Sequence, residues 1–482
     1  MQISNFKLFQ TGAFINGVFL ESASIFAVTN PYDNRTIAKV MNCSSSETTN
    51  AIAAAQAAFP EWSGKTAKER SKLLMKWYTL IMEHQEELAS ILTMEMGKPL
   101  SEAKGEIAYG ASFIEWFSEE AKRVYGDTIP GHQADKRILV LKQPIGVVGA
   151  ITPWNFPNAM ITRKIAPAIA VGCTVVIKPA ELTPLSALAL CVLANEAGIP
   201  PGVINVIPTH RPAEVGQVLT SHPAVKKISF TGSTEVGKLL LEQSASTVKK
   251  VTLELGGNAP FIVFDDADID AAVEGAIISK YRNAGQTCVC TNRFFAQAEI
   301  HDEFVEKFTK AVASQKIGNG MDQDVTIGPL IEEKAVQSIE KLIENAIHSG
   351  AKVTTGGKRI SDSLMFEPTV LTSVTHEMAL NNTEIFGPVA PITKFTSEDQ
   401  VISMANDTPY GLAAYFYGSD HARIWRTAEA LQYGMVGINT GLISTEVAPF
   451  GGVKESGFGR EGSKYGVDDY LEIKYLCWGG IS

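Results

Sequence analysis

Thr174-Val175-Val176-Ile177 opens a stretch in which short apolar segments alternate with segments of helical pattern. The next apolar segments are Val203-Ile204-Asn205-Val206-Ile207 and Lys227-Ile228-Ser229-Phe230, and helical patterns begin at Pro184, near Ala213 and near Thr234. Such alternation predicts β-strands that are each followed by an α-helix. Strands connected in this way form a parallel sheet covered by helices, so the predicted fold class is α/β.

The same kind of reading extends to both sides of this stretch. On the amino-terminal side, residues 47–59 and 67–96 carry apolar residues at helical spacing, and residues 137–151 are rich in strand-forming types. On the carboxyl side, a second alternating region runs from 259 to about 448. The segment 470–476 alternates strictly and has no partner nearby, so we expect it to pair with a distant strand, in this subunit or in another.

The composition limits the number of domains and the classes of protein to which the chain can belong. The chain has 482 residues, 45% of them hydrophobic, which suffices for two or three domains with their own cores. A net charge of -10 argues against binding to nucleic acid or to an anionic membrane. No secretory signal or membrane-spanning segment is predicted, and six cysteines in so long a chain do not indicate a disulfide framework, so a reducing cytoplasm is expected.

Two motifs suggest covalent chemistry on a carbonyl group. Cys288 lies in Gly285-Gln286-Thr287-Cys288-Val289-Cys290, and Glu254 lies in Leu253-Glu254-Leu255-Gly256-Gly257-Asn258. A thiolate and a general base are what such chemistry needs. Taken singly, a cysteine is more often a buried small hydrophobe, and a glutamate is more often solvated or a helix cap. The eight histidines show no ligand spacing, so neither a metal site nor a Cys-His pair is predicted.

Other polar residues fall where predicted strands end. The turn that contains Gly232 and Ser233 follows a strand and opens a helix, which suits a pyrophosphate, although it lacks one glycine of the dinucleotide fingerprint. Lys178 and Glu181 follow another strand and would suit ribose hydroxyls; an exposed charge pair is the alternative. Asn155 lies in Trp154-Asn155-Phe156-Pro157, which is either a rigid turn or a donor to a developing oxyanion.

These motifs belong to a longer series that resembles the aldehyde dehydrogenase superfamily. Seven blocks appear in that superfamily's order and cover nearly the whole chain. They are Ile151-Thr152-Pro153-Trp154-Asn155-Phe156-Pro157, Lys178-Pro179-Ala180-Glu181, Phe230-Thr231-Gly232-Ser233, Leu253-Glu254-Leu255-Gly256-Gly257, Gly285-Gln286-Thr287-Cys288, Glu384-Ile385-Phe386-Gly387-Pro388 and Pro449-Phe450-Gly451-Gly452. Further stretches around Arg163, Arg282, Cys290, Ser444 and Gly462–Gly466 are most similar to the succinate-semialdehyde dehydrogenase branch.

The resemblance implies a fold of three parts. Residues 1–123 and 144–254 would form a Rossmann-type dinucleotide-binding domain. Residues 255–463 would form an α/β catalytic domain, and 124–143 with 464–482 a small β oligomerisation arm. A homo-oligomer, either a dimer or a tetramer, is expected from the same resemblance.

The resemblance also implies a mechanism. Cys288 would attack the aldehyde, and Asn155 with the Cys288 backbone N–H would stabilise the oxyanion of the thiohemiacetal. After hydride transfer to the cofactor, Glu254 would activate the water that hydrolyses the thioester. Residues expected at the cofactor are Ile151, Thr152, Pro153, Trp154, Lys178, Glu181, Gly232, Ser233, Leu255, Glu384 and Phe386.

Cofactor and substrate preferences follow from charge. Glu181 would accept hydrogen bonds from the adenosine ribose and repel a 2′-phosphate, so NAD is expected to be preferred, with NADP possible because of Lys178. Arg163 and Arg282, with the hydroxyl of Ser444, would bind the distal carboxylate of succinate semialdehyde, which would be oxidised to succinate. Thr445 could share the role of Ser444.

Three alternatives remain open on the sequence. Another aldehyde, such as glutarate semialdehyde, would use the same catalytic residues. A structural paralogue without activity would have no reason to keep Cys288, Glu254 and Asn155 together, and a cysteine hydrolase lacks its histidine. Cys290 is either inert packing or a resolving cysteine that forms a reversible disulfide with oxidised Cys288.

Overall fold

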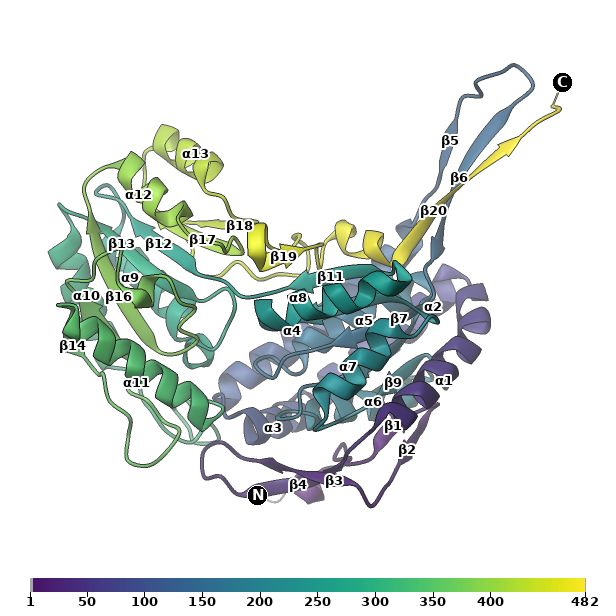
Figure 1. The fold of residues 1–482 in the computed structure, drawn as a ribbon, viewed down its shortest axis with the longest axis horizontal. Helices are drawn as coiled ribbons and strands as arrows, with labels where there is room; N and C mark the ends of the chain where they lie inside the picture. Colours follow the sequence, from purple (N-terminus) through teal and green to yellow (C-terminus); the bar gives the residue numbers. More distant parts are fainter. Residues whose placement is uncertain (1–2, 482) are drawn as a thin grey trace.

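The computed structural model describes residues 3–481 as two α/β lobes with a narrow β arm projecting from one of them (Figure 1). Residues 1, 2 and 482, which the predicted domain ranges include, lie outside the described part. Among residues 3–481, no helix is both long enough and apolar enough to cross a membrane.

The first lobe contains an eight-stranded sheet whose centre is parallel. Its order is β19-β11-β10-β7-β8-β9-β1-β2. The parallel strands are β7 (Val147–Ile151), β8 (Thr174–Lys178), β9 (Ile204–Val206), β10 (Val225–Thr231) and β11 (Lys250–Glu254). The antiparallel edges are β1 (Ala13–Ile15) with β2 (Val18–Leu20) on one side and β19 (Gly457–Phe458) on the other. The predicted Rossmann-type sheet is confirmed.

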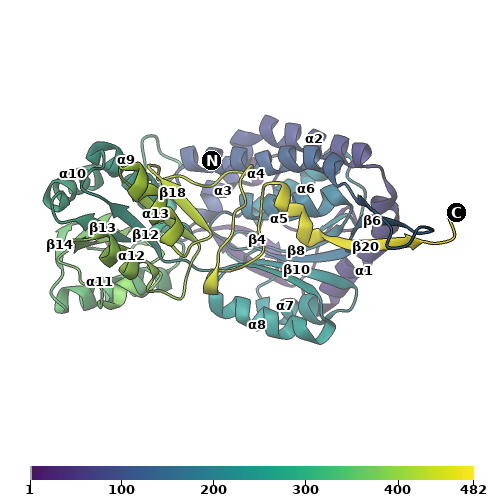
Figure 2. The same cartoon turned by 90° about the horizontal axis from the view of Figure 1, so that it is seen from above.

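Helices cover both faces of this sheet (Figure 2). One face carries α1 (Ser45–Gly64), α7 (Pro212–Ser221) and α8 (Thr234–Ser244). The other carries α2 (Ala67–Glu83), α3 (Gln85–Met96), α4 (Leu100–Glu120), α5 (Ala159–Val171) and α6 (Leu185–Ala197). The predicted helix over 67–96 is broken at His84, whose backbone leaves the helical region and separates α2 from α3.

The second lobe is built on a seven-stranded sheet of order β14-β15-β16-β13-β12-β17-β18. Its strands are β12 (Ala259–Val263), β13 (Thr291–Gln297), β14 (Lys352–Thr355), β15 (Thr369–Thr372), β16 (Val389–Phe395), β17 (Ala413–Tyr417) and β18 (Met435–Ile438), of which only β14 is antiparallel. The helices are α9 (Ile269–Tyr281), α10 (His301–Ala313), α11 (Glu333–His348), α12 (Glu398–Asn406) and α13 (His421–Ala430).

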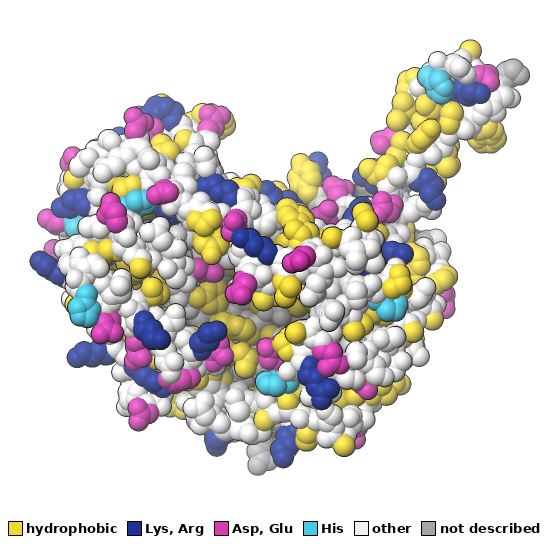
Figure 3. Space-filling model, viewed as in Figure 1, with side chains coloured by type: hydrophobic (Ala, Val, Ile, Leu, Met, Phe, Trp, Pro, Cys, Tyr) yellow, Lys and Arg dark blue, Asp and Glu magenta, His cyan; other side chains and the backbone are white. Residues whose placement is uncertain are grey.

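The arm consists of β5 (Asp127–Ile129), β6 (Arg137–Pro144) and β20 (Leu471–Trp478). The tail strand β20 finds its partner in its own subunit, because it pairs antiparallel with β6 from Leu471 opposite Pro144 to Trp478 opposite Arg137. Apolar side chains remain exposed along the arm (Figure 3), among them Ile473, Tyr475 and Trp478. A separate hairpin of β3 (Ile25–Thr29) and β4 (Thr36–Met41) lies near the amino terminus.

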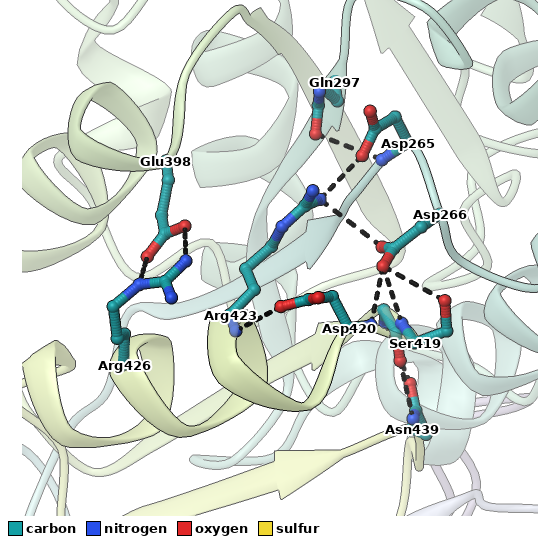
Figure 4. Close-up of polar contacts among 10 residues, drawn as sticks. Asp265, Asp266, Gln297, Glu398, Ser419, Asp420, Arg423, Arg426 and Asn439 are labelled. Atoms are coloured by element: carbon teal, nitrogen blue, oxygen red, sulfur yellow. Dashed lines mark hydrogen bonds and ion pairs between the residues drawn. The ribbon is translucent and has the colours of Figure 1, made fainter.

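Two observations concern how the parts are joined. The strand β19, which falls within the stretch assigned by sequence to the catalytic domain, pairs with β11 of the first sheet. In the second lobe, the Asp266 carboxylate accepts hydrogen bonds from the backbone N–H groups of Ser419 and Asp420, and Arg423 contacts both Asp265 and Asp266 (Figure 4). Arg423 and the backbone N–H groups satisfy these carboxylates, so we assign the cluster to tying α13 onto β12 and β17.

Candidate active site

A cavity of about 250 Å³ lies where the two lobes meet, on the molecule's hollowed face (Figure 3). The carboxyl ends of β7, β10 and β11 of the first sheet point toward it, which is where open α/β sheets bind ligands, and the segments that precede β13 and β16 of the second sheet form its other side. Predicted site residues from all three groups line it. They are Cys288 and Asn155; Pro153, Trp154, Gly232, Ser233, Leu255, Glu384 and Phe386; and Arg163, Arg282 and Ser444.

Cys288 lies in the loop between α9 and β13. This loop turns tightly because Asn283, Ala284 and Gly285 all adopt left-handed backbone conformations. Gly257 packs directly against this loop. A Cβ at this position would collide with the Cys288 carbonyl oxygen, so only glycine fits there. Burial raises the pKa of the Cys288 thiol to about 12, although Arg163 acts in the opposite direction. The resting nucleophile is therefore a thiol, and it must lose its proton when it attacks.

Two donors beside the cavity keep a hydrogen that no described residue accepts. The Asn155 Nδ2 donates one hydrogen to the carbonyl oxygen of Gln286 at 3.0 Å, and Asn155 itself lines the cavity. The Cys288 backbone N–H donates to no residue of the described chain, 3–481. One hydrogen of the Asn155 amide and the Cys288 N–H are thus free for an oxyanion.

Glu254 is the last residue of β11, between β10 and β19, and its side chain is buried. Its Oε2 has no hydrogen-bond partner. Burial raises the pKa of Glu254 well above its ordinary value, and the nearby Glu461 carboxylate adds to this effect. Glu461 is held beside it by Lys164, with 2.6 Å between Nζ and Oε1. A carboxylate with a raised pKa is a stronger base once it is ionised.

The residues expected at a dinucleotide follow the carboxyl ends of β7, β8, β10 and β11. Thr152 and Thr231 hold buried hydroxyls without a hydrogen-bond partner among residues 3–481, and Ser233 caps α8, whose first N–H groups point toward the cavity end of the sheet. Lys178 and Glu181 form an ion pair of 2.8 Å. Unsatisfied hydroxyls, a helix amino terminus and a carboxylate suit the ribose and pyrophosphate of a dinucleotide, so the residues present fit the group.

Ile151 ends β7, just ahead of this set. On the nicotinamide side, the Glu384 Oε1 accepts a hydrogen bond from the Gly257 N–H at 3.0 Å. Burial raises the pKa of Glu384 to about 7. Phe386, which has a left-handed backbone, packs edge-on against Trp154 with ring centres 5.5 Å apart. Together these side chains form one wall of the cavity.

The two predicted substrate arginines differ in their surroundings. Arg163 is buried, lies 2.8 Å from the Glu461 carboxylate, which it shares with Lys164, and stacks on Phe450. Arg282 forms no ion pair or side-chain hydrogen bond with any residue from 3 to 481; its Cζ lies 5.3 Å from the centre of the Phe156 ring, and its charge acts on the Glu102 carboxylate without an ion-pair contact. Arg282 therefore brings to the cavity a positive charge that contacts no carboxylate of the described residues.

Cys290 is buried and does not line the cavity that Cys288 lines. Its Sγ donates to the carbonyl oxygens of Lys280 and Thr291, each at 3.3 Å. Burial raises the pKa of its thiol. The structure therefore shows Cys290 as a buried free thiol with two backbone carbonyls as alternative acceptors of its one hydrogen.

Sequence reasoning missed several residues of the site. Tyr109 and Phe156 line the cavity, and Lys98 and Asn283 hold Asn155 from behind. Tyr109 lies within α4, where no motif marks it. No spacing rule marks Lys98 or Asn283, because each acts through a backbone carbonyl that the sequence does not reveal.

Comparisons with known proteins agree with this geometry. The Aldehyde dehydrogenase family matches residues 19–476. The chain is 60% identical to a glutarate-semialdehyde dehydrogenase of Pseudomonas putida over 479 residues, 99% of each chain. It is 58% identical to GabD, the succinate-semialdehyde dehydrogenase (NADP(+)) of Escherichia coli, over 99% of this chain and all of that one.

A solved structure is equally similar. The succinate-semialdehyde dehydrogenase from Burkholderia pseudomallei superimposes with a TM-score of 0.97 at 57% identity, covering 99% of this chain and 100% of that one. A two-lobed α/β fold with a cysteine between the lobes defines an NAD(P)-dependent dehydrogenase of aldehydes. The chain belongs to the aldehyde dehydrogenase family.

Proposed function

We propose that the protein oxidises succinate semialdehyde to succinate, with glutarate semialdehyde as the alternative substrate. The observation that carries this proposal is Arg282, a guanidinium at the cavity wall with no anionic partner among residues 3–481. A guanidinium matches a carboxylate with two parallel hydrogen bonds and stays charged at any working pH. Relatives are named for semialdehydes in which two or three carbons separate the carboxylate carbon from the aldehyde carbon, and they support the same substrate class.

The catalytic steps follow from the chain's own groups. The Cys288 sulfur attacks the carbonyl carbon as its proton leaves, and the free Asn155 and Cys288 donors stabilise the oxygen. A dinucleotide held by Ser233 at the start of α8 and by Glu181 would supply the hydride acceptor for this carbon. Glu254 then takes a proton from the water that attacks the Cys288 thioester, the C–S bond breaks to return the Cys288 sulfur, and Arg282 releases the distal carboxylate of the acid. Ser444 and Arg163 complete the carboxylate pocket.

We also propose a preference for NAD. Lys178 is the cation that could bind a 2′-phosphate, and Glu181 neutralises it at 2.8 Å while adding a negative charge beside the ribose. Glu181→Ser would release Lys178, so kcat/KM with NADP should rise relative to NAD. A wild type that prefers NADP would contradict this proposal, and the relative from Escherichia coli named for NADP(+) makes the measurement necessary.

The arm supports assembly into a homo-oligomer, as a dimer or a tetramer. A three-stranded sheet standing away from the lobes cannot bury its apolar side chains within one subunit. Six free cysteines are consistent with work in a reducing cytoplasm. A disulfide between Cys288 and Cys290 remains a proposal; it requires the Cys290 Sγ to leave its two carbonyl partners, and intact-mass measurement after peroxide treatment tests it.

One assay panel tests the main proposal. Aldehydes of three to six carbons, with and without a terminal carboxylate, are each assayed with NAD and with NADP. We expect the highest kcat/KM for succinate semialdehyde; a maximum at glutarate semialdehyde would establish the alternative. Equal values for butanal and succinate semialdehyde would remove the carboxylate from recognition, and no activity with any aldehyde would contradict the catalytic proposal itself.

A further inference from the structure

The two donors proposed for the oxyanion come from different lobes. Asn155 follows β7 of the first sheet, and Cys288 precedes β13 of the second. Their relative position is therefore set by contacts across the junction between the lobes and not by one rigid element. A reacting oxygen needs both donors within hydrogen-bond distance at the same time.

Asn283 makes these contacts across the junction. Its Nδ2 donates to the carbonyl oxygen of Asn155 at 3.0 Å and to that of Gln286 at 3.2 Å. Gln286 lies two residues before Cys288 and also accepts the hydrogen bond from the Asn155 side chain. The Asn283 backbone N–H donates to Oε2 of Glu102 in the first lobe at 2.8 Å. One residue thus joins the Cys288 loop to the Asn155 turn and to α4.

The chemistry of the position explains why an asparagine suits it. A primary amide has two hydrogens on one nitrogen, so it can serve two carbonyl oxygens at once. The backbone of Asn283 is left-handed, with φ 55°, a conformation that asparagine tolerates better than most residues. Lys98 also holds the Asn155 carbonyl, with Nζ at 2.8 Å, but from the same lobe as Asn155. Together with the hydrogen bond from the Asn155 amide to Gln286, Asn283 sets Asn155 relative to the Cys288 loop.

We propose that Asn283 is a positioning residue that aligns the two halves of the oxyanion site. The inference rests on the proposed thiohemiacetal mechanism and deepens it. Asn283 touches neither the aldehyde nor the cofactor in this role. It fixes the amide of Asn155 against Gln286, so that the second amide hydrogen points at the oxygen of the adduct.

The test replaces Asn283 with glycine, which keeps the left-handed backbone and removes the amide. The matched control is Ala284→Gly, since Ala284 has the same left-handed conformation in the same loop and carries no polar group. Asn283→Gly should lower kcat about 10–100-fold, because small misplacements of reacting groups cost up to this much. The loss should be equal for succinate semialdehyde and butanal, while Ala284→Gly stays near wild type.

Two further readouts separate positioning from a general loosening of the loop. Hydrolysis of an activated ester also passes through an oxyanion, so Asn283→Gly should slow it. Alkylation of Cys288 by iodoacetamide forms no oxyanion, so its rate should not change. Asn283→Ser keeps one donor and should be more active than Asn283→Gly. It also provides the test if the glycine variant folds poorly.

A double-mutant cycle with Asn155→Ala identifies the residue through which Asn283 acts. If it acts through Asn155, adding Asn283→Gly to Asn155→Ala should reduce kcat little further. Fully multiplicative losses, or an alkylation rate that falls together with kcat, would overturn the inference. Wild-type activity in Asn283→Gly would overturn it too, while leaving the proposed function intact; the proposed function fails only if the wild type oxidises no aldehyde.

Discussion

Arg163 and Arg282 look equivalent in the sequence and differ in the charges around them. Arg282→Ala should raise KM for succinate semialdehyde about 10–100-fold, because hydrogen bonds to charged groups contribute about 1.5–3 kcal/mol. The KM for butanal should hardly change. Arg163→Ala is the informative comparison: it removes one of the two cations that pair with the buried Glu461 carboxylate, the other being Lys164, so activity toward both aldehydes and thermal stability should fall. If Arg282→Ala changed KM equally for succinate semialdehyde and for butanal, the role of Arg282 would be structural.

Glu254 should give the reaction a dependence on pH. Burial and Glu461 raise its pKa, so it is protonated, and unable to act as a base, over a wider range of pH than an ordinary glutamate. We expect kcat to rise with pH through a midpoint above the ordinary glutamate range. In Glu254→Gln, kcat should be lower by about 10²–10⁴-fold and this rising limb should vanish. If the variant keeps the limb, another group is the base.

For individual residues, the sequence identified the reactive groups but not the side chains that surround them. Cys288, Asn155 and residues from six of the seven motif blocks line the cavity, and the block with Lys178 and Glu181 does not. The pairing of Arg163 with Glu461 joins positions almost three hundred residues apart, and nothing local marks it. The orientation of Cys290 away from the cavity likewise depends on packing against Lys280.

The packing of α4 against the start of α5 depends on one carboxylate. Glu106 of α4 accepts hydrogen bonds from the Asn158 and Ala159 N–H groups at the start of α5, and its other oxygen lies 2.6 Å from Lys98. Glu106→Leu leaves a buried cation unpaired and should cost about 3–5 kcal/mol in the free energy of unfolding. Denaturant unfolding measures this loss.

The double variant Lys98→Met with Glu106→Leu should recover a large part of that stability, since an apolar pair of similar volume replaces the buried ion pair. Glu119→Leu on the same helix is the control, because its pair with Lys122 is exposed and contributes about 1 kcal/mol or less. If Glu106→Leu lost no more free energy of unfolding than Glu119→Leu, Glu106 would not be important for the packing of α4 against α5.

Among the elements, periodicity predicted the types well and the boundaries less well. The strands at 174–178 and 225–231 and the helices that follow appear where their patterns indicated. The break at His84 was missed, since no proline or glycine marks it. The run over 137–151 was read as one β-rich segment. It divides at Ile145-Gly146 into β6 of the arm and β7 of the first sheet.

At the level of the whole molecule, the arm should control assembly. Successive residues of a strand face opposite sides, and Tyr475 and Leu476 are 67% and 41% exposed, so both faces of the arm carry uncovered apolar surface. Tyr475→Lys and Leu476→Lys should each lower the molar mass measured by light scattering. Asn345→Lys on the remote helix α11 introduces the same charge and should leave the mass unchanged. Wild-type mass in both arm variants would contradict this role.

The sequence predicted a projecting arm through resemblance, and its physical reason is visible only in the structure. Strict alternation over 470–476 indicated a strand but could not identify its partner, because register is set by the chain entering and leaving the sheet. The structure supplies β6 as that partner. Assembly with other subunits depends on surfaces that a single chain leaves open.

The closure of the first sheet by β19 bears on how the protein is synthesised. This strand and Glu461 come from the end of the chain, yet they cover the edge of β11 and lie beside Glu254. While a ribosome still holds the nascent chain, the first lobe has an unpaired edge strand, which chaperones and proteases can engage. A chain that terminates before β19 would thus lack Glu461 beside the proposed base Glu254. Its unpaired β11 edge would expose it to degradation.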